Sequence, residues 1–282
     1  MPPLTNRYPK LDHPDISAVL FHPRPERPPQ VPGVVPHTFR MEDGARIGAR
    51  LHLAAPDTPT ILFFHGNGEV AADYDDIGPG FVAQGVSFWV IDYRGYGESD
   101  GMPSASAMMA DAHGVFQQTR NWLSSQGRGG PLFLMGRSLG SAPAIELAAA
   151  APDAIAGLII DSGFGTTTPL LVTLGIQPST YGITEADGFQ NLQKIARISK
   201  PTTILHGQFD DLIPPADAEM LQVQSAAHVK EFHLIPGADH NTIFAVTGDL
   251  YFQAIRQFMN KILKVRPRRY QSRRNPAAAA SD

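Results

Sequence analysis

A serine lies at the centre of a Gly-x-Ser-x-Gly motif at residues 136–140. An apolar run at 131–135 precedes the motif, and an alanine-rich stretch at 142–150 follows it. A strand that ends at the serine and a helix that starts just after it form a nucleophile elbow, a sharp turn that exposes the hydroxyl. Glycines two positions before and after the serine leave room for the turn, and the helix amides favour negative charge beside it. The sequence predicts Ser138 as a nucleophile; an ordinary glycine-rich turn is the alternative.

A serine hydroxyl is a weak nucleophile at neutral pH, so it needs a base, and the base needs an acid that orients it. Two later segments follow apolar runs: residues 206–214 contain Asp210, and residues 236–241 contain His240. In a parallel sheet the loops at the carboxyl ends of the strands meet at one edge, so these groups can converge on the serine. We therefore predict a triad of Ser138, Asp210 and His240, in the chain order serine, aspartate, histidine.

Two other aspartates compete for the role of the acid. Asp211 adjoins Asp210, and Asp161 follows the apolar run at 155–160, a rarer position for the acid. Asp239 stands beside His240, but its side chain points elsewhere if that loop is extended.

The rest of the chain supplies the elements that must hold these loops. Strand-like runs at 38–41 and 46–53 are joined by Glu42-Asp43-Gly44-Ala45, whose Asp-Gly pair is a hairpin signal. Six more apolar runs follow, at 60–64, 86–91, 131–135, 155–160, 202–205 and 231–235. Helical stretches alternate with them, at 105–125, 142–150, 216–226 and 249–263. This alternation predicts one α/β domain in which a mostly parallel sheet is covered by helices on both faces.

Four segments carry a resemblance to a known superfamily: Phe64-His65-Gly66-Asn67-Gly68, Asp92-Tyr93-Arg94-Gly95-Tyr96-Gly97-Glu98-Ser99, Gly136-Arg137-Ser138-Leu139-Gly140, and His206-Gly207-x-x-Asp210-x-x-Ile213-Pro214 with His240. On these motifs, residues 37–264 resemble the α/β-hydrolases, and among them the serine-hydrolase branch of small esterases, thioesterases and prolyl-aminopeptidase-like enzymes. The resemblance implies an eight-stranded, mostly parallel sheet with helices on both faces and a small helical cap. It also favours Asp210 over Asp211, because Asp210 fills the aspartate position of the fourth motif.

The resemblance further implies an oxyanion hole, a pair of backbone amides that bind the negative oxygen of a tetrahedral intermediate. One amide is that of Leu139, directly after the nucleophile. The second is that of Asn67 in the His-Gly-Asn-Gly segment, with Gly68 in reserve. A turn residue that satisfies its own backbone is the alternative for Asn67.

Other polar residues in the motifs have structural interpretations. His65 and His206 each precede a glycine at a strand end, where such histidines hold loops by hydrogen bonds. Asp92 and Arg94 are expected to form a structural pair. The histidines do not combine with carboxylates at metal-ligand spacing, so we expect no metal and no cofactor.

The chain divides into three parts. Residues 1–36 contain ten prolines, and we expect an irregular extension laid across the domain with the apolar run 16–21 packed against it. Residues 37–264 form the single domain, with a short cap at 162–199, and residues 265–282 form a basic tail that we expect to be disordered. Apolar cap residues either line a shallow acyl site or pack the cap onto the sheet: Phe164, Leu170, Leu171, Leu174, Tyr181 and Phe189.

Composition excludes several classes of protein. The 282 residues are 43% hydrophobic and contain no cysteine, which is ordinary for a globular domain without disulfides. No apolar run approaches the roughly 18 residues of a membrane span, and the N-terminus lacks the features of a secretory signal, so a cytoplasmic protein is expected. The net charge of −4 includes the basic tail, so the domain itself is acidic and a poor candidate for binding nucleic acid. The oligomeric state stays open.

These observations favour a serine hydrolase that cleaves a small-molecule carboxylic ester or thioester through an acyl-enzyme intermediate. Two alternatives stay open. A prolyl-aminopeptidase-like peptidase ranks lower, because the short cap offers only Glu185 and Asp187 to hold a substrate amine. A non-catalytic ligand-binding protein of the same fold ranks lower as well, because every element of the triad is present.

Overall fold

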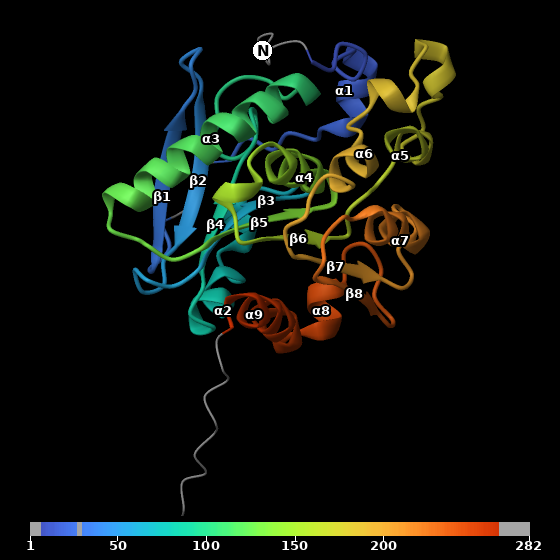
Figure 1. Ribbon diagram of the computed structural model, residues 1–282. Helices are drawn as coiled ribbons and strands as arrows, with labels where there is room; N and C mark the ends of the chain where they lie inside the picture. The colour runs from blue at the N-terminus through green and yellow to red at the C-terminus, as the bar shows by residue number, and fades with distance from the viewer. Residues whose placement is uncertain (1–6, 27–29, 265–282) are drawn as a thin grey trace, which may run out of the picture.

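An eight-stranded sheet runs through the centre of the computed structural model, which describes residues 7–26 and 30–264 (Figure 1). The predicted tail at 265–282 lies outside the described residues. In order across the sheet the strands are β1 (Val34–Arg40), β2 (Arg46–His52), β4 (Ser87–Ile91), β3 (Thr60–Phe64), β5 (Leu132–Arg137), β6 (Gly157–Asp161), β7 (Thr202–Gly207) and β8 (Lys230–Ile235). β2 is antiparallel to both of its neighbours, and the strands from β3 to β8 are parallel. The predicted eight-stranded, mostly parallel sheet is confirmed.

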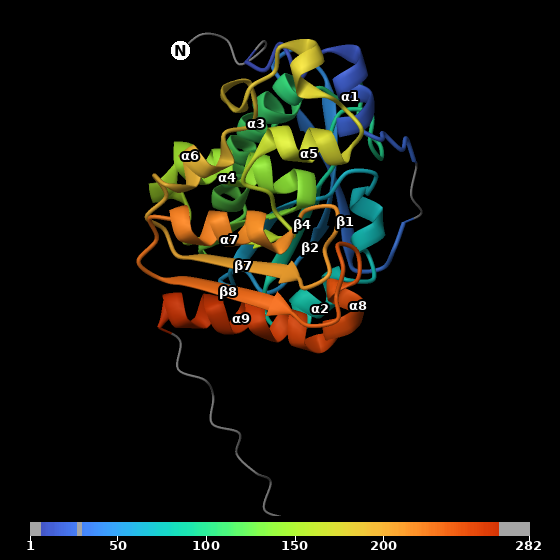
Figure 2. The ribbon, with the colours of Figure 1, turned by 90° about the vertical axis from the view of Figure 1, so that its right-hand side faces the viewer.

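Helices cover both faces of this sheet, as predicted. One face carries α3 (Ala105–Ser125), α4 (Ser141–Ala150) and α7 (Pro215–Gln224), and the other carries α2 (Gly78–Ala83) and α9 (Asp249–Leu263) (Figures 1 and 2). Successive residues of the central strands point alternately into the two apolar clusters on either side. This double burial explains why those strands read as continuous apolar runs. Four short helical segments lie between these elements, at η1 (Ala71–Tyr74), η2 (Ser138–Gly140), η3 (Pro152–Ala154) and α8 (Ile243–Thr247).

The N-terminal residues 7–26, here called the N-terminal strap, pack against the domain. Within them α1 (Pro14–Leu20) is a short helix with proline at its first turn, and Ile16, Leu20 and Phe21 are buried, as expected for the run 16–21. The strap is thus more regular than expected, and β1 begins at Val34, two residues before the expected end of the extension.

Strap residues reach both the cap and the loop after β3. Lys10 pairs with Asp187, and the Tyr181 hydroxyl donates to Asp15, both on the cap side. Arg24 pairs with Asp73 in η1. The strap therefore bridges two segments that surround the carboxyl edge of the sheet.

The cap is short, as expected, and consists of α5 (Thr167–Thr173), η4 (Pro178–Tyr181), η5 (Glu185–Asp187) and α6 (Asn191–Ile195). The Glu185 carboxylate accepts hydrogen bonds from the amides of Thr167 and Thr168 at the start of α5. Phe164, Leu171 and Phe189 are fully buried. These three side chains therefore pack the cap onto the domain.

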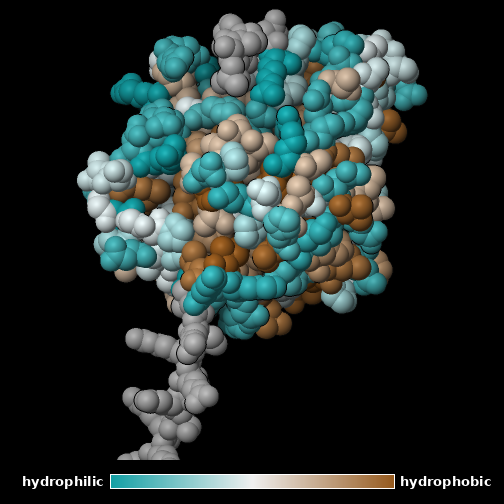
Figure 3. All heavy atoms as spheres, viewed as in Figure 1, coloured by the Kyte–Doolittle hydropathy of each residue, from teal (hydrophilic) through white to brown (hydrophobic). Residues whose placement is uncertain are grey.

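Figure 3 shows a largely hydrophilic face with hydrophobic patches, which lie mainly in its lower half. The exposed hydrophobic side chains of α8 and α9 include Phe244, Val246 and Leu250. Among the described residues, no helix combines the length and the apolar character that crossing a bilayer requires.

Candidate active site

Ser138 stands at a strained turn between β5 and α4. Its φ is +50°, in the left-handed region that residues with a side chain rarely adopt. A Cβ added at Gly136 would lie 2.1 Å from the carbonyl oxygen of Gly140, and one added at Gly140 would lie 2.1 Å from that of Phe64. The motif therefore needs glycine at both positions, because the end of β5 lies against the turn at Gly140 and this turn lies against the end of β3.

The three predicted triad residues form one hydrogen-bonded line. His240 Nε2 lies 2.9 Å from Ser138 Oγ, and His240 Nδ1 lies 2.8 Å from Asp210 Oδ2. All three are buried, with 8%, 6% and 3% of the surface of Ser138, His240 and Asp210 exposed. A carboxylate at Nδ1 fixes the proton there, which leaves Nε2 free to accept the serine proton.

The loop after β7 explains why Asp210 rather than Asp211 faces the histidine. Asp210 Oδ1 accepts hydrogen bonds from the amides of Leu212 and Ile213, at 3.1 and 2.8 Å, which leaves Oδ2 for His240. His206 Nε2 donates to the Ile213 carbonyl at 2.8 Å and lies 3.3 Å from Asp210 Oδ2. His206 thus holds the loop as the sequence predicts, and Asp211 is exposed.

Asp161, the rarer alternative for the acid, has other partners. It lies at the end of β6 and accepts hydrogen bonds from the hydroxyls of Tyr251, at 2.6 Å, and Ser162, at 3.0 Å. These contacts place Asp161 on the sheet face covered by α2 and α9, away from the Ser138–His240–Asp210 line.

The structure places the residues of the predicted oxyanion hole in two loops at the carboxyl edge. Leu139 is the second residue of η2 and is buried, and the first amides of a helical turn have no partner inside it. The Asn67 side chain accepts hydrogen bonds from the His22 amide at 2.7 Å and the Tyr96 hydroxyl at 2.9 Å. Because these contacts fix the loop, the Asn67 backbone amide stays the predicted donor, and Gly68, with a φ of +76°, stays its reserve.

The other polar residues of the motifs have structural partners. His65 lies under the loop, with Nδ1 2.8 Å from the Gly66 carbonyl oxygen and Nε2 3.4 Å from Asp92 Oδ1. The expected pair of Arg94 with Asp92 is not formed. Arg94 pairs with Asp111 and Asp43 instead. The Asp92 carboxylate instead accepts from the Ala71 amide at 2.8 Å. Across residues 7–26 and 30–264, no three His, Cys, Asp or Glu side chains gather in a way that could hold a metal ion.

Comparisons with known proteins find a similar family and similar folds. Residues 55–178 match the family model described as serine aminopeptidase, S33. The fold matches an esterase of Pyrococcus furiosus with a TM-score of 0.69 at 14% identity, over 85% of this chain and 98% of that one. It also matches a soluble variant of the monoglyceride lipase of Saccharomyces cerevisiae, with a TM-score of 0.64 at 22% identity over 83% and 97% of the two chains.

The chain has the fold of the α/β-hydrolases.

Among curated relatives of this hydrolase-fold chain, an uncharacterized protein of Mycobacterium tuberculosis is 29% identical over 78% of this chain and 77% of its own length. The protein bem46 of Schizosaccharomyces pombe is 29% identical over 71% of this chain and 67% of its own. The α/β hydrolase domain-containing protein WAV2 of Arabidopsis thaliana is 26% identical over 79% and 77%.

Sequence reasoning missed an ion pair that connects three loops of this candidate site. Arg137, the residue before the nucleophile, pairs with Glu69 in the loop after β3. Its other terminal nitrogen donates to the carbonyl of His240 at 2.8 Å and to the side chain of Asn241 at 3.2 Å. Glu69 in turn accepts from the Gly66 amide and from the Tyr74 hydroxyl, each at 2.6 Å. An arginine beside the nucleophile was the available signal, but its partners are 68 and 103 residues away.

The surroundings of Arg137 and Tyr74 keep both side chains protonated. Burial by itself would lower the pKa of Arg137, but the charge of Glu69 and the neighbouring acidic groups raises it above its usual value. Burial and the charge of Glu69 raise the pKa of Tyr74 well above 10, so the phenol keeps its proton and donates to Glu69. The Arg137 guanidinium therefore keeps its charge at neutral pH.

An apolar cavity of about 230 Å³ lies between the cap and the acid loop. Phe164 and Leu170 contribute from the cap side, and Leu212, Ile213 and Pro214 contribute from the segment that follows Asp210. Of the six apolar cap residues, these two line the cavity and the others pack elsewhere. The cavity thus begins within three residues of the acid of the triad.

Proposed function

We propose that the chain is a serine hydrolase that cleaves a small-molecule carboxylic ester or thioester through an acyl-enzyme intermediate. The observation that carries the proposal is the buried hydrogen-bonded line from Ser138 through His240 to Asp210, with the serine on a strained elbow. Structural neighbours described as an esterase and a monoglyceride lipase support it.

In the first half of the proposed reaction, Ser138 Oγ attacks the acyl carbonyl while His240 Nε2 takes the hydroxyl proton. Asp210 stabilises the imidazolium that forms. The amides of Leu139 and Asn67, or Gly68 in place of Asn67, bind the negative oxygen of the tetrahedral intermediate. His240 then gives its proton to the departing alcohol or thiol, which leaves the acyl group on the serine.

In the second half, a water molecule loses a proton to His240 Nε2 and attacks the acyl-serine carbonyl. Collapse of the second intermediate breaks the bond to Ser138 Oγ, which takes the proton back, and releases the carboxylic acid. We assign the acyl chain to the apolar cavity between the cap and the acid loop, because Leu212 and Ile213 line it beside Asp210.

The family description raises a second candidate, a peptidase that holds a substrate amine. In the described part of the cap, Glu185 is engaged with the amides of Thr167 and Thr168, and Asp187 with Lys10 and Thr184. The two cap acids are thus committed to structural contacts, which favours an acyl ester over a peptide.

Labelling and turnover test the proposal. A fluorophosphonate probe should label the wild type and the Ser179→Ala control, whose substitution removes an exposed cap serine, but not Ser138→Ala. Hydrolysis of p-nitrophenyl and thioester substrates of graded chain length should fall at least about 10³-fold in Ser138→Ala. Labelling that persists in Ser138→Ala would overturn the serine assignment. Turnover of aminoacyl amides but not of esters would favour the peptidase, and absence of any turnover would favour a binding protein.

A further inference from the structure

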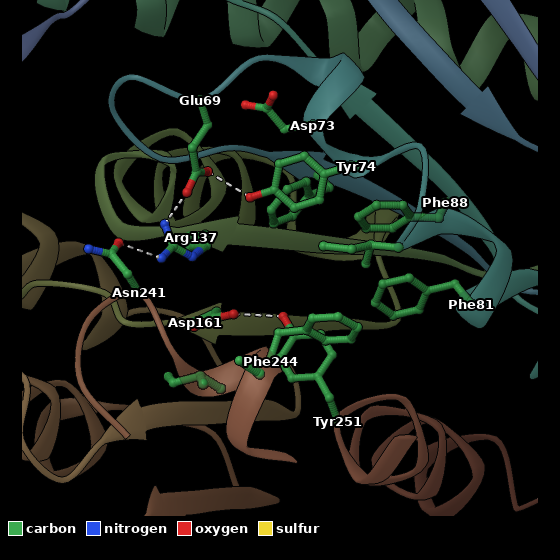
Figure 4. Close-up of a pocket in the computed structure, with 14 residues that line it drawn as sticks. Glu69, Asp73, Tyr74, Phe81, Phe88, Arg137, Asp161, Asn241, Phe244 and Tyr251 are labelled. Carbon is green, nitrogen blue, oxygen red and sulfur yellow. Dashed lines mark hydrogen bonds and ion pairs between the residues drawn. The ribbon is translucent and has the colours of Figure 1, made fainter. Parts of the chain in front are cut away.

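A cavity of about 380 Å³ lies on the sheet face covered by α2 and α9 (Figure 4). Its fourteen lining residues include Arg137 and Asn241 but none of Ser138, His240 and Asp210. Its volume is within the range of pockets that bind small molecules. The two cavities share no lining residue, so this cavity is separate from the proposed acyl site, and Asn241 brings it beside the loop of His240.

Aromatic rings form most of the apolar wall of this cavity: Phe63, Tyr74, Phe81, Phe88, Phe244 and Tyr251. The rings pack against one another, with centroids 4.8 Å apart for Phe63 and Tyr74 and 4.3 Å apart for Phe81 and Phe88. Phe244, at 37% exposure, lies at the mouth, whereas Phe63, Phe81 and Phe88 are fully buried. The wall is therefore largely preformed.

The charged groups around the cavity are mostly negative. Glu69, Asp73 and Asp161 contribute carboxylates, and Arg137 contributes one guanidinium. Arg137 balances Glu69, and Arg24 of the N-terminal strap balances Asp73 from outside the lining. Asp161 accepts from the hydroxyls of Tyr251 and Ser162 and shares the charge of Arg137 with Glu69, so the three carboxylates exceed the two guanidiniums by one charge. Burial and the charge of Asp161 raise the pKa of Tyr251 well above 10, so its phenol stays neutral.

We propose that this cavity binds a small organic cation, a protonated amine carried on an apolar body. A ligand that fills the cavity displaces water from the carboxylates, and an ammonium group replaces the lost hydrogen bonds while a neutral body does not. The faces of the aromatic rings attract the same positive charge. An anion would have to compete with Glu69 and the His240 carbonyl for Arg137, whose terminal nitrogens already donate to both.

Three probes of similar size and different charge test the proposal: benzylamine, benzyl alcohol and benzoate. An NMR titration of the full chain at neutral pH should give a millimolar Kd for benzylamine, at least about fivefold tighter than for benzyl alcohol, and no binding of benzoate. The same preference should persist in Ser138→Ala, because Ser138 does not line the cavity. The titration of Ser138→Ala therefore tests amine binding separately from the proposed ester hydrolysis.

Two variants locate the site. Asp161→Asn should weaken benzylamine binding at least about fivefold and remove the preference over benzyl alcohol. Because Asp161 is buried and its substitution can disturb folding, Ala245→Lys, at the exposed mouth, places a positive charge there without altering the core. Ala245→Lys should weaken benzylamine binding by a similar factor. Two controls should leave the affinity unchanged: Val223→Lys, which adds the same charge at an exposed position of α7, and Asp57→Asn, which removes an exposed carboxylate elsewhere.

Equal binding of the three probes, tighter binding of benzoate or no binding of benzylamine would overturn the proposal. So would benzylamine affinity that is unchanged in Ala245→Lys, because the amine would then bind elsewhere.

Discussion

The choice between two adjacent aspartates depends on backbone amides, not on the carboxylates themselves. The amides of Leu212 and Ile213 turn the Asp210 side chain toward His240 Nδ1, while Asp211, one residue later, is exposed. A carboxylate at that ring nitrogen holds the imidazole in the tautomer that can accept the serine proton. Asp210 and Asp211 have the same side chain in different surroundings, so substitutions at the two positions can be compared directly.

We expect Asp210→Asn to lower kcat for ester hydrolysis by about 10³- to 10⁴-fold, because the amide favours the wrong tautomer of His240. Asp211→Asn should stay within about twofold of the wild type, since an exposed substitution leaves the triad untouched. Steady-state kinetics on one p-nitrophenyl ester compares the two. Equal losses in both variants would contradict the assignment of the acid.

At the scale of elements, the Glu69–Arg137 pair joins the loop after β3, the elbow after β5 and the loop after β8. It ties the Gly66 amide of the predicted oxyanion segment to the carbonyl of His240. The pair touches no reacting atom, so both residues are positioning residues. A displacement of about 1 Å in such loops is enough to cost roughly 100-fold in rate.

Arg137→Gln and Glu69→Gln are each expected to lower kcat by about 10- to 100-fold with a smaller change in KM, because substrate still binds while the loops lose their alignment. The double variant should be little worse than either single one, since both break the same connection. Arg46→Gln, which removes an exposed ion pair with Asp100, is the control and should keep kcat within about twofold. Additive losses in the double variant would show that the two residues act separately.

The sequence predicts the triad but not the ion pair beside it. The triad was predictable because each member follows an apolar strand, and parallel strands bring such loops to one edge. The Glu69–Arg137 pair was not, because side-chain partners 68 residues apart leave no spacing pattern. Arg94 illustrates the same limit, since it pairs with Asp111 and Asp43 instead of its near neighbour Asp92.

Among the elements, the strands were predicted better than the short helices. The central strands are buried on both faces and so read as apolar runs, whereas α2, with six residues and two glycines, gives no periodic signal. α1 was hidden in a proline-rich segment because one of its prolines occupies the first helical turn, where no amide donor is needed.

At the scale of the whole molecule, Glu146 of α4 joins four segments. Its carboxylate pairs with Lys194 of α6 at 2.7 Å, with Arg7 of the N-terminal strap and with His113 of α3. Burial alone would raise the pKa of Glu146, but the hydrogen bond with His113 and the charges of Lys194 and Arg7 bring it well below its usual value. The cluster therefore couples the stability of the fold to pH.

We expect Glu146→Gln to lower the free energy of unfolding by about 3 kcal/mol at pH 7, because it leaves buried Lys194 without its anionic partner. The wild-type carboxylate has a lower pKa in the folded state than in the unfolded state, so its stabilisation is complete above the ordinary value of 4.5 and is lost as pH falls below it. Urea denaturation at a series of pH values should show the gap between wild type and variant narrowing below pH 4.5. A gap that is constant with pH would contradict this account.

The N-terminal strap has a practical consequence. It lies against the cap and the loop after β3, whereas α9 ends at Leu263 on the far side of the molecule from the cap (Figures 1 and 2). We therefore expect a surface or reporter attached beyond α9 to leave the cap and the strap free and turnover unchanged. Attachment before the strap is expected to crowd the cap and the loop after β3 and to lower turnover.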